Sequence, residues 1–196
     1  MDDPGFVPER LLAHQFLRAE VSARWLGILD LRPGMEVADL GSGPGLVALQ
    51  MAARVRPGGR VWAVDRSEAM VAHAERLAHA ARLDRWVRAV AADLAAPEAE
   101  ELPIPAGSLD RALAANVLHH LGDPSRFLAL ARRLLDPGGR LLVVEFDPDR
   151  GLDFGPPARE RMAPESLEEA AARAGLGLLA GGVAGEAWYH RLFTPA

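Results

Sequence analysis

Three glycines at alternate positions follow a short apolar segment that ends near an aspartate. Asp39 stands before Gly41, Gly43 and Gly45, and the residues after them have the composition of a helix. Backbone N–H groups and the positive end of a helix dipole are free at such a strand-to-helix turn, and glycine lets a ligand approach the backbone closely. We therefore predict a ligand site in this segment, which also contains Ser42. A tight turn without a ligand is the alternative.

The spacing of the glycines distinguishes two kinds of cofactor site. The dinucleotide fingerprint is Gly-x-Gly-x-x-Gly, and Leu46 stands where its third glycine should be. The sequence instead has acid-x-Gly-x-Gly-x-Gly. A carboxylate before the glycines suits a ligand with an ammonium and a sulfonium centre better than one with a pyrophosphate. A nucleotide-cofactor oxidoreductase stays an alternative, and Leu46 argues against it.

This pattern resembles motif I of the class I S-adenosylmethionine-dependent methyltransferases. In that family the loop holds the methionine end of the cofactor. The resemblance implies that S-adenosylmethionine is bound by five residues of the segment, namely Asp39, Gly41, Ser42, Gly43 and Gly45.

A second acid, Asp65, ends the next apolar segment. It follows Gly45 by close to the ~20 residues that separate the glycine turn from the ribose-binding acid in α/β nucleotide sites. A carboxylate can accept hydrogen bonds from both ribose hydroxyls, so we predict that Asp65 binds the ribose, with a strand-end cap as the alternative. The run resembles the family pattern Asp-x-Ser-x-x-Met, which implies that Arg66 and Met70 also lie at the cofactor. Ser67 can cap the helix that follows.

Two further strand ends complete the predicted cofactor site. The third predicted strand ends at Asp93 and Leu94. In the family, the carboxylate at this position takes the adenine amino group, and the next backbone N–H takes a ring nitrogen. Asn116 ends the fourth predicted strand and is assigned to the same site. Because the carboxyl ends of parallel strands border one crevice, we expect all these residues to converge there.

Two histidines follow the fourth predicted strand. The run from Asn116, Asn-x-Leu-His-His-Leu-x-Asp-Pro, resembles that of the small-molecule ubiquinone/menaquinone-biosynthesis methyltransferases (methyltransferase type 11). Histidine can take a proton near neutral pH, so His119 and His120 are the candidate catalytic residues beside the acceptor. The alternative is that they only bind backbone carbonyls or belong to the fold's own polar network. A base is needed only if the acceptor must lose a proton, and Glu145 and Asp147 are the next candidates.

Composition excludes several kinds of chemistry. The chain has no cysteine, which excludes disulfides, thiolate metal sites and cysteine nucleophiles, and it has no lysine, which excludes Schiff bases on a side chain. We predict no metal site. The formal net charge is −5 and no basic block is present, so we expect no nucleic-acid partner.

Strand and helix signals alternate from Met35 to Ala174, which predicts a doubly wound parallel sheet. The resemblance implies a Rossmann-like α/β fold with a seven-stranded mixed sheet, its last strand antiparallel, and helices on both faces. We expect a single domain, with a helical segment at residues 1–32 over a methyltransferase domain at residues 33–196. No signal peptide and no apolar run of about 20 residues is visible, so we expect a cytoplasmic protein without a membrane span.

These observations predict an S-adenosylmethionine-dependent methyltransferase (EC 2.1.1.-) whose partner is a small-molecule methyl acceptor. Two alternatives stay open. One is a regulator that binds S-adenosylmethionine without transferring its methyl group. The other is a methyltransferase that acts on protein or nucleic acid, which the acidic charge and the lack of a recognition domain disfavour.

Overall fold

The central strands of the sheet are short apolar runs that are buried on both faces. The computed structural model describes residues 19–96, 102–152 and 154–196. Its seven strands form one sheet in the order β3-β2-β1-β4-β5-β7-β6. The first five strands are parallel to one another, and β7 is antiparallel to both of its neighbours, β5 and β6. The strands are β1 Glu36–Leu40, β2 Arg60–Asp65, β3 Val87–Ala91, β4 Leu109–Ala115, β5 Leu135–Phe146, β6 Leu176–Val183 and β7 Trp188–Pro195.

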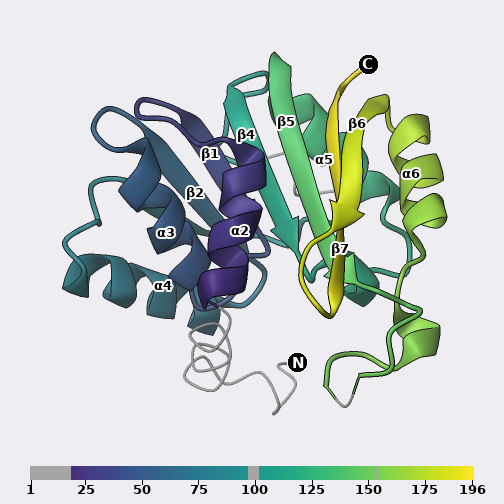
Figure 1. The fold of residues 1–196 in the computed structure, drawn as a ribbon. Helices are drawn as coiled ribbons and strands as arrows, with labels where there is room; N and C mark the ends of the chain where they lie inside the picture. The colour runs from purple at the N-terminus through teal and green to yellow at the C-terminus, as the bar shows by residue number, and fades with distance from the viewer. Residues whose placement is uncertain (1–18, 97–101, 153) are drawn as a thin grey trace.

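Helices cover both faces of this sheet (Figure 1). One apolar core lies between the sheet and α2 and α3, and the other lies between the sheet and α5 and α6. Pro164 occupies the first turn of α6, where its missing N–H has no cost, and Gly175 follows the helix with φ +78°. The helices are α2 Ala19–Leu29, α3 Leu46–Val55, α4 Glu68–Ala80, α5 Ser125–Leu134 and α6 Pro164–Arg173, with short 3₁₀ turns η2 Leu118–His120 and η3 Ala158–Glu160.

The predicted fold class is confirmed, including the antiparallel last strand between its two neighbours. The part of the predicted N-terminal helix before Ala19 lies outside the described residues. None of the helices in the described ranges is long and apolar enough to cross a membrane.

One boundary differs from the sequence prediction. The run Pro137-Gly138-Gly139 is typical of a turn, and the sequence alone predicts a strand only from Leu141, but β5 already begins at Leu135. Leu109 pairs with Leu135 and Arg111 with Arg140, so the strand contains an irregular stretch between these pairs. A Cβ on Gly139 would lie 2.7 Å from the carbonyl oxygen of Leu109. Glycine therefore lets the two strands approach closely enough for pairing to begin before the expected turn.

Trp25 attaches α2 to the far end of the sheet. Its ring is 4% exposed, its Nε1 donates to the carbonyl oxygen of Ala184 at 2.8 Å, and it packs edge-on to Trp188 with ring centroids 5.7 Å apart. The segment from Ala184 to Trp188 joins β6 to β7. One side chain therefore links the first described helix to the last two strands.

We predict that Trp25→Ala lowers the free energy of unfolding by about 3–5 kcal/mol, because it removes a large buried ring. Trp25→Phe keeps most of the packing and loses only the Nε1 hydrogen bond, so its loss should be smaller. Urea unfolding followed by circular dichroism measures both. A loss below about 1 kcal/mol in Trp25→Ala would show that α2 is held by other contacts.

Candidate cofactor and active site

The glycine loop between β1 and α3 needs glycine for two separate reasons. All three glycines have positive φ: +85° at Gly41, +52° at Gly43 and +94° at Gly45. A Cβ on Gly41 would lie 2.3 Å from Cγ2 of Val117, and one on Gly45 would lie 2.6 Å from Cβ of Ala74. Other side chains are therefore excluded by backbone strain and, at the first and third glycine, by close neighbours.

Asp39 lies beneath this loop and is 3% exposed. It accepts a backbone hydrogen bond from Ala48 in the first turn of α3. Its Oδ2 atom and the Oγ atom of Ser42 are buried without a hydrogen-bond partner among the described residues. The pKa of Asp39 is raised to about 7. Burial is the main cause, and the negative charge of Asp65 is the second.

Two buried oxygens without partners are a cost that native structures rarely leave uncompensated. A ligand that carries a positively charged ammonium group would supply donors to both, and its charge would favour ionised Asp39. The residues present at the loop therefore fit the methionine end of S-adenosylmethionine.

Asp65, at the end of β2, ties the glycine loop to the start of α4. Its Oδ2 accepts the N–H of Gly43 at 2.8 Å and its Oδ1 accepts the N–H of Ser67 at 3.0 Å. Each carboxylate oxygen has two acceptor positions, so each can still accept one ligand hydroxyl. The predicted cap by the Ser67 side chain is wrong: Ser67 occupies the N-cap position, but its hydroxyl makes no capping bond.

The residues predicted to surround the adenine differ in exposure. Met70 and Leu94 are buried, at 2% and 7% exposed, whereas Arg66 and Asp93 are exposed. The Oδ1 atom of Asp93 accepts the N–H of Ala95 at 3.0 Å. Since β3 is paired with β2 in parallel, Asp93 and Arg66 follow neighbouring strands at the same edge of the sheet.

Asn116 closes β4 in the left-handed conformation, with φ +58°. Its side-chain oxygen accepts the indole Nε1–H of Trp188 at 2.9 Å. Asparagine tolerates this backbone conformation better than most residues. The predicted site residue therefore also connects β4 to the start of β7.

Glu145, near the end of β5, is completely buried. Its Oε1 accepts the N–H groups of Val117 and Leu118 at 2.9 and 2.7 Å, and its Oε2 lies 2.7 Å from Nδ1 of His119. The sequence indicates Glu145 only as a further candidate base and does not predict this hydrogen-bond network. An acid within the apolar run from Leu141 to Phe146 was the available signal.

The two candidate histidines have different surroundings. The side chain of His119 is 5% exposed, and its ring packs edge-on to Phe146 with centroids 5.7 Å apart. His120 is an exposed residue whose ring centroid lies 4.1 Å from that of His119. Partial desolvation, followed by the neighbouring His119, lowers the pKa of His120 to about 4, so His120 is neutral at pH 7.

The other acid considered for catalysis lies in the loop after β5. The Asp147 side chain is 22% exposed and pairs with Arg150 at 3.4 Å, and its Oδ1 accepts the N–H of Asp149. Across the described ranges, no cluster of three or more histidine, cysteine, aspartate or glutamate side chains could hold a metal ion.

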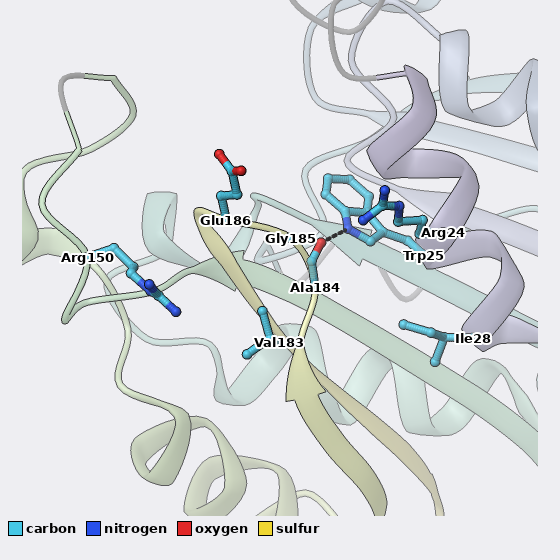
Figure 2. Close-up of a pocket in the computed structure, with 8 residues that line it drawn as sticks. All are labelled: Arg24, Trp25, Ile28, Arg150, Val183, Ala184, Gly185 and Glu186. Atoms are coloured by element: carbon cyan, nitrogen blue, oxygen red, sulfur yellow. Dashed lines mark hydrogen bonds between the residues drawn. The ribbon is translucent and has the colours of Figure 1, made fainter.

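A cavity of about 780 Å³ lies between α2 and the turn that joins β6 to β7. Figure 2 shows its lining residues, with the hydrogen bond from Trp25 to Ala184 on one side. No predicted cofactor or catalytic residue lines it. The cavity is lined by Arg24, Trp25, Ile28, Arg150, Val183, Ala184, Gly185 and Glu186.

The sequence was compared with known proteins. Residues 38–143 match the methyltransferase domain family Methyltransf_11. An uncharacterized 37.1 kDa protein of transposon TN4556 from Streptomyces fradiae is 41% identical over 63% of this chain and 34% of its own length. The ubiquinone/menaquinone biosynthesis C-methyltransferase UbiE of Bordetella avium is 37% identical over 62% of this chain and 44% of its own. The chain thus spans less than half the length of these curated relatives.

Solved structures agree with the fold. A S-adenosylmethionine-dependent methyltransferase from Aquifex aeolicus superposes with a TM-score of 0.86 over 97% of this chain and 100% of its own, at 23% identity. Geranyl diphosphate C-methyltransferase from Streptomyces coelicolor superposes with a TM-score of 0.75 over 99% of this chain and 86% of its own, at 15% identity. The family match covers more than half of the sequence, so the chain belongs to the Methyltransf_11 family of class I S-adenosylmethionine-dependent methyltransferases.

Proposed function

We propose that the chain transfers a methyl group from S-adenosylmethionine to a small-molecule acceptor. The observation that carries the cofactor assignment is the pair of buried oxygens without partners, Oδ2 of Asp39 and Oγ of Ser42, beneath a loop of three left-handed glycines. An ammonium group can donate to both oxygens and can neutralise the carboxylate.

Each strand end has a role in this proposal. Asp39 and Ser42 accept from the ammonium group, and the glycines admit the methionine portion to the backbone. Asp65 accepts from the ribose hydroxyls. The residues assigned to the adenine end and its approach are Arg66, Met70, Asp93, Leu94 and Asn116.

The bound cofactor would supply a methyl group that its sulfonium centre already activates. The protein then contributes mainly proximity and orientation, which can be worth about 7–11 kcal/mol. His119 and His120 follow β4, beside Asn116, and a base there is required only for an acceptor that carries a proton.

Three observations support a small acceptor over a macromolecule. The formal net charge of −5, without a basic block, disfavours nucleic acid. The described residues form one sheet with its helices, and they include no second unit that could recognise a protein. Several of the relatives are named as C-methyltransferases of ubiquinone and menaquinone biosynthesis.

We predict that the purified chain releases S-adenosylhomocysteine when it is incubated with S-adenosylmethionine and a panel of metabolites. The panel should include phenols, enols, amines, carboxylates and thiols, with histone and RNA mixtures as macromolecular comparisons. Turnover on one small-molecule class supports the proposal. Binding by calorimetry without turnover on any class would favour the regulator, and turnover on RNA or protein alone would replace the acceptor assignment.

We predict that Asp65→Asn weakens S-adenosylmethionine binding by one to two decades. The amide keeps one acceptor oxygen but loses the charge and half of the acceptor positions, a change worth about 1.5–3 kcal/mol. Calorimetry on folded protein measures the affinity, and Asp84→Asn, at an exposed position, is the matched control. Equal affinity in Asp65→Asn and wild type would place the ribose elsewhere.

We predict that S-adenosylhomocysteine, which has the same ammonium group, binds wild-type protein about tenfold more tightly at pH 8 than at pH 6. Only ionised Asp39 attracts the ammonium group, and a pKa of about 7 means that this form grows from about a tenth to about nine-tenths of the molecules. Affinity therefore rises with pH. Asp39→Asn cannot ionise and should lose this rise. A rise of equal size in both proteins would assign it to the ligand or to another group.

A further inference from the structure

A carboxylate buried in an apolar sheet is stable only when its surroundings supply donors. Glu145 is 0% exposed, and its neighbours in β5, Val144 and Phe146, belong to the core. Burial of such a group without partners would cost several kcal/mol. The network described above compensates this cost, with two backbone N–H groups on one oxygen and a histidine nitrogen on the other.

The backbone groups that Glu145 holds belong to the segment that covers the glycine loop. The side chain of Val117 lies where a Cβ on Gly41 would be, at 2.3 Å from Cγ2. The N–H of Val117 donates to Glu145 at 2.9 Å. One buried carboxylate therefore fixes the residue that packs on the first glycine of the cofactor loop.

The same carboxylate determines how His119 presents its ring. An ionised carboxylate only accepts hydrogen bonds, so Nδ1 must carry a proton to donate to Oε2 at 2.7 Å. In a neutral imidazole this leaves Nε2 without a proton and able to accept one. Nε2 of His119 has no hydrogen-bond partner among the described residues, and this atom is not fully buried.

His120 is less suited to accept a proton. Its pKa is lowered to about 4, so its neutral ring is a weak base at pH 7. The ring of His119, in contrast, is held between Glu145, Phe146 and His120.

We propose that Glu145 is a positioning residue that holds His119 as the Nδ1–H tautomer, and that Nε2 of His119 is the base for an acceptor that must lose a proton. This inference rests on the proposed function. Nε2 takes the proton as the acceptor atom uses the electron pair of that bond to bind the methyl carbon. The pair of the broken sulfur–carbon bond stays on sulfur, which gives S-adenosylhomocysteine, and Glu145 stabilises the imidazolium that results.

The decisive variant is Glu145→Gln. Its amide oxygen can still accept from Val117 and Leu118, but its NH₂ group donates to Nδ1 of His119 and moves the imidazole proton to Nε2. We expect ¹⁵N NMR of histidine-labelled protein to show the Nδ1–H tautomer for His119 in wild type and the Nε2–H tautomer in Glu145→Gln. Affinity for S-adenosylhomocysteine should stay within about threefold, while turnover falls by roughly two to four decades.

Controls separate positioning from folding. Glu169→Gln removes the same charge at an exposed position of α6 and should leave the tautomer, binding and turnover unchanged. His119→Gln should lose turnover as Glu145→Gln does, and the double variant should be no slower, because both act through one group. If Glu145→Gln does not fold, the tautomer of wild type and the turnover of His119→Gln decide the question.

Several results would overturn the inference. One is an Nε2–H tautomer of His119 in wild type, and another is full turnover in folded Glu145→Gln or folded His119→Gln. A third is the loss of both cofactor binding and turnover in Glu145→Gln, which would give the carboxylate a structural role alone. The tautomer is measured without an acceptor. A panel without turnover therefore refutes the proposed function, and a functioning enzyme with unaffected variants refutes only the role of Glu145.

Discussion

Carboxylates near the strand ends accept hydrogen bonds from backbone N–H groups in the loops that follow neighbouring strands. The candidate site depends on this arrangement. Asp65, on β2, accepts from Gly43 in the loop after β1, and Glu145, on β5, accepts from Val117 after β4. Free N–H groups are unavoidable where parallel strands turn into helices. In this chain acidic side chains from adjacent strands satisfy them, so the loops are ordered relative to one another before any ligand binds.

The buried acids Asp39 and Glu145 differ in how completely their oxygens are satisfied, and this difference supports the ligand-binding role proposed for Asp39. Glu145 has three donors on its two oxygens. Asp39 is almost as buried, yet its Oδ2 has no partner among the described residues, and its pKa is raised to about 7. Ionised Asp39 therefore lowers the stability of the folded chain, a cost that native proteins tolerate mainly where a ligand removes it.

Local patterns predicted the fold because each one acts over a few residues. The glycine turn, Asp65 at the end of β2, Asp93 just after β3, and Pro164 at the start of α6 were all visible in the sequence. The start of β5 was not, because it depends on how closely Leu109 approaches Gly139 from another strand. The donors to Glu145 could not be predicted for the same reason, because the hydrogen-bonded residues are 26 to 28 positions apart in the sequence.

The proposed acceptor side is the part of the site that sequence patterns describe least, since its residues come from distant segments. Trp188, from β7, binds Asn116 at the end of β4 and packs on Phe146, at 5.6 Å, and on Phe154, at 6.0 Å. The proposed cofactor side is built from consecutive strand–helix units, so a short motif can encode it. An acceptor surface built from β4, β5, β7 and the loop after β5 can change by substitution in any one of them. The residues that hold His119 are therefore better evidence of the chemistry than any motif on that side.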